Sequence, residues 1–260
     1  MAVNVDYLLH LADNALILGQ RNAEWCGHGP ILEEDIAMAN IGLDHIGQAR
    51  LIYQHVAAQI GGDATEDTLA YFRNPEAFRN YVLLELPHNT AFAPSAAVER
   101  DYAVTIARNF LYSSLMILVW EALQRSIDAQ LAAIAAKSSK EVRYHLRHST
   151  DWILRLGDGT AESHNRMQAA LDHLMPYTQE FWVPSPIEVE AAQSGVGIDV
   201  GTLRGAWQAS VDLVLAEATL RSPGAKGHVT HGKDGIHSEH LSYLLGEMQS
   251  LARAHPEAVW

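Results

Sequence analysis

A stretch near the middle of the chain, residues 140–149 (KEVRYHLRHS), carries the two side-chain types of a carboxylate-bridged iron site. Glu141 and His145 lie four positions apart, and on a helix this spacing places both on one face. Proteins that hold two irons inside a helical bundle use a Glu on each of two helices and a Glu-x-x-His motif on each of the other two. The stretch is therefore a near match to a di-iron ligand pair, and its register decides whether it can bind metal.

The first register takes Asp44 and Glu141 as the acidic anchors of the two motifs. The residues three positions later are Gly47 and Tyr144, and neither is a histidine. The literal Glu-x-x-His of the chain, at residues 85–88, contains a proline that disrupts a helical turn. This register therefore lacks the histidines that a di-iron centre takes.

The second register is shifted by one residue, and neither of its motifs keeps a carboxylate. A di-iron centre takes four carboxylates and two histidines. We therefore predict an inactive site, with no catalytic, cofactor-binding or metal-binding residue in this chain. The eroded ligand positions are Ala15, His45, Gln48, Tyr112, Val142 and His145.

An emptied site would leave charged side chains in the middle of long helices, at Asp44, Glu141 and Arg143. Buried charges are costly unless they are paired. We expect these three side chains to form a buried polar network in the former cavity. The alternative is a single weakly bound metal, with surviving ligands such as Asp13, Asp44, Glu141 or His145.

The elements that must position these residues are helices, because strand signals are weak and helical periodicity is strong. Residues 97–125 are apolar nearly all round, which is typical of a helix buried on most sides. Residues 128–156 carry their apolar side chains on one face. Residues 31–60 also follow the 3–4 spacing of a helix. Their apolar series is Leu32, Ile36, Ala39, Leu43, Ile46, Tyr53, Ala57 and Ile60.

These helices form two hairpins in sequence. A helix over about 5–25 is joined to residues 31–60 by the turn CGHGP, which places Pro30 in the first turn of the second helix. Residues 97–125 and 128–156 form the second pair. A connection of about 35 residues separates the pairs, and its aromatic content predicts a short helix plus a packed loop.

Two hairpins joined by one long crossover are the ferritin-like arrangement. We therefore predict an all-α, ferritin-like four-helix bundle with additional C-terminal helices, in a single domain over residues 1–260. Glycines end the second and fourth helices at residues 61–62 and 157–159. The additional helices are expected at about 161–182, 202–221 and 237–254, with loops at 183–201 and 222–239.

Composition limits the partners and the compartment. The chain has 18 basic and 31 acidic residues, a formal charge of −13, which argues against non-specific binding to nucleic acid or to an anionic membrane. We expect no membrane span and no signal peptide. The one cysteine, Cys26, cannot form an internal disulfide, which fits a cytoplasmic protein.

Two His-x-x-His pairs, His228 with His231 and His237 with His240, occur in the C-terminal region. Such pairs could bind zinc. The interpretation that we favour is a loop packed on the bundle or on a partner. Ser238 is expected to cap the following helix.

Three long segments point to a known family. They are RNAEWCGHGPILEEDIAMANIGLDHIGQAR, KEVRYHLRHSTDWILRLGDGT and GIHSEHLSYLLGEMQSLARAHP, with a terminal Trp260. The whole chain resembles the C subunits of the bacterial phenylacetyl-CoA epoxidases, which act in aerobic phenylacetate degradation. The resemblance implies a non-catalytic, structural subunit that supports a homologous catalytic A subunit.

In that family the A subunit holds the di-iron centre and binds the coenzyme A thioester. A reductase passes electrons from NADPH, and phenylacetyl-CoA and dioxygen give a ring epoxide. The resemblance thus implies that the partners are the A subunit and, indirectly, the other subunits and the reductase, with no cofactor in this chain. Among the eroded positions, only His145 retains the ligand type expected at its own place in the motif, since His45 stands where a carboxylate is expected.

Two other functions and one other assembly remain open from the sequence. The chain could be a free-standing metal-dependent oxygenase, or a helical module that binds an acyl-CoA without chemistry. It could also form a homodimer. For the structural role, the apolar helix over 97–125 suggests a large hydrophobic docking surface.

Overall fold

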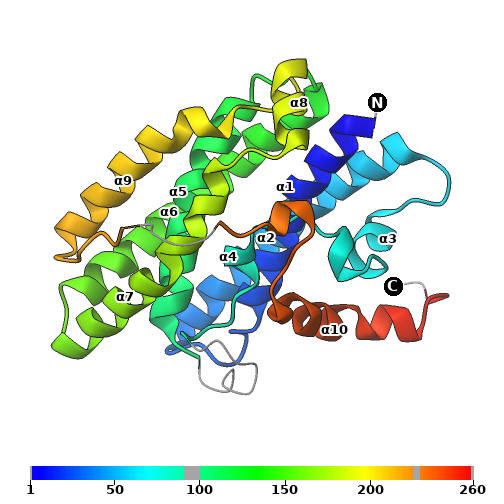
Figure 1. Cartoon of the computed structure of the whole chain (residues 1–260). Helices are drawn as coiled ribbons and strands as arrows, with labels where there is room; N and C mark the ends of the chain where they lie inside the picture. The colour runs from blue at the N-terminus through cyan, green and yellow to red at the C-terminus, as the bar shows by residue number, and fades with distance from the viewer. Residues whose placement is uncertain (1, 91–99, 225–228, 259–260) are drawn as a thin grey trace. The chain divides into compact units, whose positions relative to one another are not determined.

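The computed structural model describes residues 2–90, 100–224 and 229–258, and over these ranges the regular elements are helical apart from an isolated bridge between His231 and Ile236 (Figure 1). This confirms the predicted all-α class. The chain divides into two compact units, residues 1–86 with 231–260 and residues 87–230. The single domain expected over the whole chain stays a prediction.

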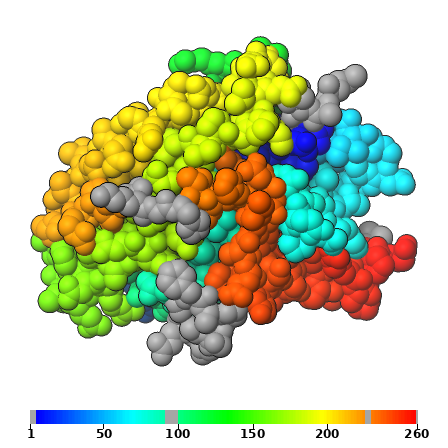
Figure 2. Space-filling view, in the orientation of Figure 1, coloured from blue at the N-terminus to red at the C-terminus, as the bar shows by residue number. Residues whose placement is uncertain are grey.

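The first unit is built on a hairpin of two long helices that lie side by side (Figure 1). Short helices of the connecting segment pack on this hairpin, and the C-terminal helix packs on the connecting segment, as Figure 2 shows with the C-terminal helix in red against the cyan segment. The elements are α1 (Ala2–Ala23), α2 (Leu32–Ile60), α3 (Glu66–Tyr71), η1 (Pro75–Ala77), α4 (Val82–Glu85), η5 (Gly232–Asp234) and α10 (Glu239–Ala254).

The two ends of α2 differ in how well the sequence predicts them. Gly61 ends the helix as expected, with a positive φ of 73° that other residues rarely adopt. Pro30, however, lies before the first turn and not in it. The N-cap residue is Ile31, which has no side-chain hydrogen bond to the helix.

Helix α2 has two apolar faces. The buried face includes Met38, Ile41 and Ile52, each at most 1% exposed. The 3–4 series that predicts the helix lies mostly on another face, where Leu32 is 72% exposed and Leu43 is 66% exposed. Periodicity therefore predicts the helix correctly but identifies the face that does not contact the core.

The second unit contains a second long hairpin, α5 with α6, and α7 and α9 pack on that pair. Helix α5 is long and apolar enough to cross a membrane, but 89% of its most apolar 18-residue window is buried inside the protein, as in a core helix. The elements are α5 (Tyr102–Leu123), α6 (Ala129–Gly157), α7 (Ala161–Leu174), η3 (Met175–Trp182), α8 (Pro186–Ser194), η4 (Val200–Leu203) and α9 (Arg204–Glu217).

Helix α8 lies in a segment expected to be a loop. Ser185 caps it by accepting a hydrogen bond from the backbone N–H of Glu188, and the Glu188 carboxylate accepts one in return from the backbone N–H of Ser185. Pro186 occupies the first helical position, where its missing N–H costs nothing. The sequence Ser-Pro-Ile-Glu is a capping box that would have predicted this helix.

Candidate functional site

Three of the eroded ligand positions lie on the first hairpin. Ala15 on α1 and His45 and Gln48 on α2 are each 1% exposed. The register inferred from spacing therefore selects interior positions on both helices. A methyl group offers a metal no electron pair, so Ala15 cannot replace a glutamate there.

The other three positions lie on the second hairpin and are equally buried. Tyr112 is on α5, and Val142 and His145 are on α6. Burial raises the pKa of the Tyr112 phenol far above its ordinary value, so this group stays protonated and neutral. Val142 again offers no donor atom. On this hairpin only His145 keeps the side-chain type of an iron ligand.

The expected network of Asp44, Glu141 and Arg143 needs correction. Arg143 is exposed, and its guanidinium contacts Glu121 on α5 at 3.2 Å on the surface. Glu141 is half-buried and pairs with Lys137 one turn earlier on α6. The reason is geometric: Val142 points inward, and each step along a helix turns the side chain by about 100°, so its two neighbours point to either side.

Asp44 does not lie in the interior either. It is half-buried on α2, directly before the buried His45. Pairing of buried charge, which led to the expectation of a network, is nevertheless present in the first unit. It is centred on a different carboxylate, Asp13 of α1.

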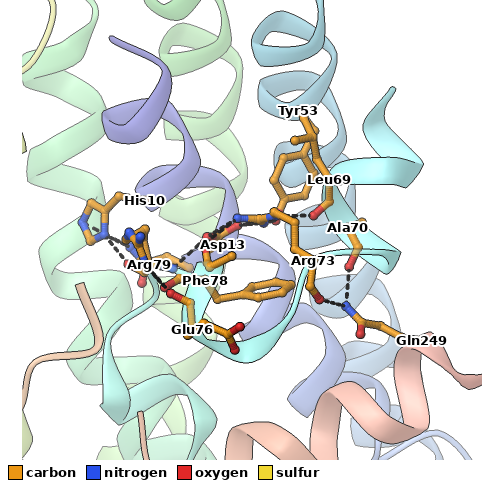
Figure 3. A network of polar contacts seen from close by, with 12 residues as sticks. His10, Asp13, Tyr53, Leu69, Ala70, Arg73, Glu76, Phe78, Arg79 and Gln249 are labelled. Carbon is orange, nitrogen blue, oxygen red and sulfur yellow. Dashed lines mark hydrogen bonds and ion pairs between the residues drawn. The ribbon is translucent and has the colours of Figure 1, made fainter. Parts of the chain in front are cut away.

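Asp13 is fully buried and accepts four hydrogen bonds (Figure 3). The Tyr53 hydroxyl donates to Oδ1 at 2.5 Å, and the backbone N–H of Arg79 donates to Oδ2 at 2.8 Å. Arg73 donates to Oδ2 through Nη1 at 3.1 Å and to Oδ1 through Nη2. A carboxylate has about four lone-pair positions, and all of those of Asp13 are in use.

Electrostatics keep this cluster charged. Burial alone would lower the pKa of Arg73, but its interactions with Asp13 and, secondly, with Tyr53 together outweigh burial and raise that pKa. Burial and, secondly, the charge of Asp13 raise the pKa of Tyr53, so the phenol remains a donor. The guanidinium also stacks over Phe78, with 4.2 Å from its central carbon to the ring centroid. The cluster therefore joins both helices of the hairpin to the connecting segment.

Spacing along the sequence could not reveal the Asp13 cluster. Tyr53 and Arg73 lie 40 and 60 residues after Asp13, and the connecting segment that carries Arg73 has no helical period. The available signal was Asp13 itself, a single aspartate within the apolar run of residues 7–18 on α1, because a buried carboxylate requires a buried cation or hydrogen-bond donors.

The C-terminal histidines contact different partners. His231 is exposed and pairs with Asp234 at 3.2 Å, whereas His228 lies outside the described residues. His237 is bound on both ring nitrogens, by the Glu85 carboxylate at 2.8 Å and by the carbonyl oxygen of Phe78 at 3.0 Å. The segment thus packs on the connecting segment of its own unit, as the favoured interpretation expects.

Ser238 caps α10 as predicted, accepting a hydrogen bond from the backbone N–H of His240. Within the described ranges, no three His, Cys, Asp or Glu side chains form a group that could hold a metal ion.

Comparison with known proteins agrees with the sequence resemblance. A family model described as phenylacetic acid catabolic protein matches residues 2–260. The chain is also 43% identical over 254 residues to the C subunit of the 1,2-phenylacetyl-CoA epoxidase of Escherichia coli (strain K12), with 98% of each chain covered. The relationship therefore extends over both helical hairpins and the C-terminal helix. The chain belongs to the phenylacetic acid catabolic protein family, whose fold is ferritin-like and helical.

Proposed function

We propose that this chain is a non-catalytic structural subunit of a multicomponent di-iron monooxygenase that epoxidises the ring of phenylacetyl-CoA. In this proposal a homologous catalytic A subunit holds the iron and the coenzyme A ester. The other subunits and an NADPH-dependent reductase complete the complex in the cytoplasm. The name of the Escherichia coli relative supports membership of such a complex.

The observation that carries the non-catalytic part is the state of the interior carboxylates. Asp13 uses all its lone pairs on Arg73, Tyr53 and a backbone N–H, so a metal would have to displace a buried ion pair. Ala15 and Val142 offer no donors at two of the eroded positions. The residues of this chain therefore do not fit a di-iron group, and we assign no reaction step to it.

The test is to express the chain alone and together with its candidate partner subunits, and to measure iron content and oligomeric mass in both cases. We expect the chain to co-purify with a catalytic subunit, and the iron to follow that subunit. Near-stoichiometric iron in the isolated chain would instead support a free-standing oxygenase. A catalytic subunit that is soluble and fully active without this chain would defeat the structural role.

The acyl-CoA-binding alternative has its own measurement. A ligand that binds only the folded state raises the melting temperature. We expect acyl-CoA esters to leave the melting temperature of the isolated chain unchanged, and a concentration-dependent increase would support the binding module.

A further inference from the structure

The helix expected to dock a partner is not available for docking. Helix α5, in the apolar stretch 97–125, is almost wholly buried inside the protein. A complex of subunits therefore needs another apolar surface. Large hydrophobic side chains that stay exposed among the described residues number fifteen, and five of these lie within residues 31–46.

Four of these residues lie along one side of α2, and the fifth, Ile31, directly precedes the helix; we call the five together the α2 stripe. Leu32, Ile36 and Leu43 are separated by four and seven residues, so they fall within about 40° of one another around the helix axis. Ile46 extends the line, which runs about 21 Å along the helix at 1.5 Å per residue. The exposed fractions are 52% for Ile31, 72% for Leu32, 52% for Ile36, 66% for Leu43 and 36% for Ile46.

The α2 stripe contributes little to the folding of this chain. The core is served by the separate buried face of α2. At the helix start, where Ser, Thr, Asp or Asn would stabilise the free N–H groups, the chain carries Ile31 with no side-chain cap. Contiguous exposed apolar patches on soluble proteins commonly mark interaction sites. The residues chosen here therefore suit contact with another molecule better than stability of the isolated helix.

Charge around the stripe distinguishes between two occupants. Between Arg21 and Arg50 the sequence has no Lys or Arg, whereas exposed or half-buried positions of α2 carry carboxylates at Glu33, Asp35 and Asp44. A second copy of the chain, packed antiparallel about the stripe's centre, would bring Asp44 opposite residues 33–35. A parallel copy would bring each carboxylate opposite itself. Both directions place like charges together, so the flanks favour a different, basic partner.

We infer that the α2 stripe is the surface on which another subunit of the complex docks, through a helix whose contact face is aliphatic and flanked by Lys or Arg. This inference rests on the proposed function, because it takes the partner from that complex. It goes further by assigning the contact to one face of one helix and by stating the chemistry of the opposite face.

The first experiment places a charge in the stripe. Ile36→Asp and Leu43→Asp should each weaken binding to the co-expressed partner subunit at least tenfold, because a carboxylate would be buried against an aliphatic face. Leu213→Asp on α9 is the matched control, since Leu213 is 70% exposed and lies in the other unit. All three variants should keep the wild-type circular dichroism spectrum, because the side chains are exposed.

The second experiment tests the flanks and maps the contact. Glu33→Lys should weaken partner binding several-fold and reduce its dependence on salt, whereas Glu162→Lys on α7 should not. Amide hydrogen exchange of residues 31–46 should slow when the partner binds. Protection confined to other surfaces would overturn the assignment.

The outcomes separate this inference from the proposed function. If the wild-type chain binds no subunit, both fail. If the wild type binds while Ile36→Asp and Leu43→Asp bind as well as Leu213→Asp, the function stands and the docking surface is wrong. If the isolated wild type is a dimer that Leu43→Asp converts to a monomer, the occupant is a second copy and the basic partner is excluded.

Discussion

The two helical hairpins differ in where they place an ion pair and in how many large aliphatic side chains they leave exposed. The α1–α2 hairpin buries charge, with Asp13 paired to Arg73 inside, and exposes aliphatic side chains such as Leu32 and Leu43 on α2. In the α5–α6 hairpin, α5 is almost wholly buried and largely apolar, although it also buries Arg108, whose guanidinium contacts the carbonyl oxygen of Pro87 and the ring of His88. The ion pair between Glu121 and Arg143 lies on the surface of this hairpin.

The contrast teaches what a solvent-facing helix of this protein looks like. The outer face of α6 carries charged side chains in i, i+4 pairs such as Lys137 with Glu141, the usual arrangement for a helix in water. The α2 stripe has no such pairs along its line. Because both helices have 29 residues in the same chain, the difference points to an outer face of α2 that is covered in the working assembly.

The largest expected effect breaks the buried charge of the first hairpin. Asp13→Ala leaves the Arg73 guanidinium buried without its carboxylate, and we expect a loss of about 3–5 kcal/mol in the free energy of unfolding, measured in urea. Asp172→Ala breaks an exposed pair with Arg221 in the other unit and should cost less than about 1 kcal/mol.

A double variant sharpens this prediction. Asp13→Leu combined with Arg73→Met removes both charges, so its loss should be smaller than the sum of the two single losses by about 1–3 kcal/mol. Additive losses would show that the two side chains stabilise the protein only through packing. The buried ion pair of the first hairpin would then make no contribution of its own to the free energy of unfolding.

The second prediction compares truncation of a buried apolar side chain with truncation of an exposed one. Phe110→Ala in the core of α5, where Phe110 is fully buried, should cost about 3–5 kcal/mol. Leu43→Ala on the α2 stripe should change the stability of the isolated chain by no more than about 0.5 kcal/mol. Urea unfolding of the two variants measures both values, and a loss above about 2 kcal/mol for Leu43→Ala would mean that the stripe serves the fold.

The α2 stripe also marks the limit of periodicity as a predictor. A 3–4 spacing gives the helix and nearly its bounds, because backbone geometry imposes that period on either apolar face. It does not say which face contacts the core when both faces are apolar. Two of the polar residues of the buried face, His45 and Gln48, were identified only through the comparison with ligand spacing.

Local sequence patterns also fail to predict contacts between residues that are far apart in the sequence. The six positions predicted to be eroded ligands were inferred from spacing within each hairpin, and all six are buried. The partner of Asp13 cannot be inferred from spacing, because Arg73 belongs to a connecting segment whose path is set by tertiary packing. The expected buried network was wrong for Arg143, because a residue in the middle of a helix can face the solvent as well as the core, and Arg143 faces the solvent.

The capping box of α8 gives a third, smaller prediction, on a helix in a segment that was expected to be a loop. Ser185→Ala should cost about 1 kcal/mol, because the N–H of Glu188 loses its acceptor. Ser238→Ala at α10 of the first unit is the companion variant, with a similar loss. Amide exchange should accelerate over residues 188–192 in the first variant and leave α10 unchanged, and the reverse should hold in the second.

The smallest expected effect is a pH dependence in the first unit, at His240 on α10. Burial, followed by the positive charge of Arg21, lowers the pKa of this imidazole, while Glu239 and Glu85 oppose the shift. The unfolded chain therefore takes up a proton near pH 6.5 while the folded chain does not, so stability falls as pH decreases through about 6.5 toward the lower folded pKa.

His240→Gln should remove this part of the pH dependence. We expect the urea midpoint of the wild type to fall more between about pH 7.5 and about pH 5.5 than that of the variant. Every other titrating group, including those near His237, is common to both proteins and cancels in the difference. Equal slopes would mean that α10 does not hold His240 in its buried, neutral form. Because Glu239 and Glu85 oppose the lowering of the His240 pKa, this difference in stability should be the smallest of the four effects.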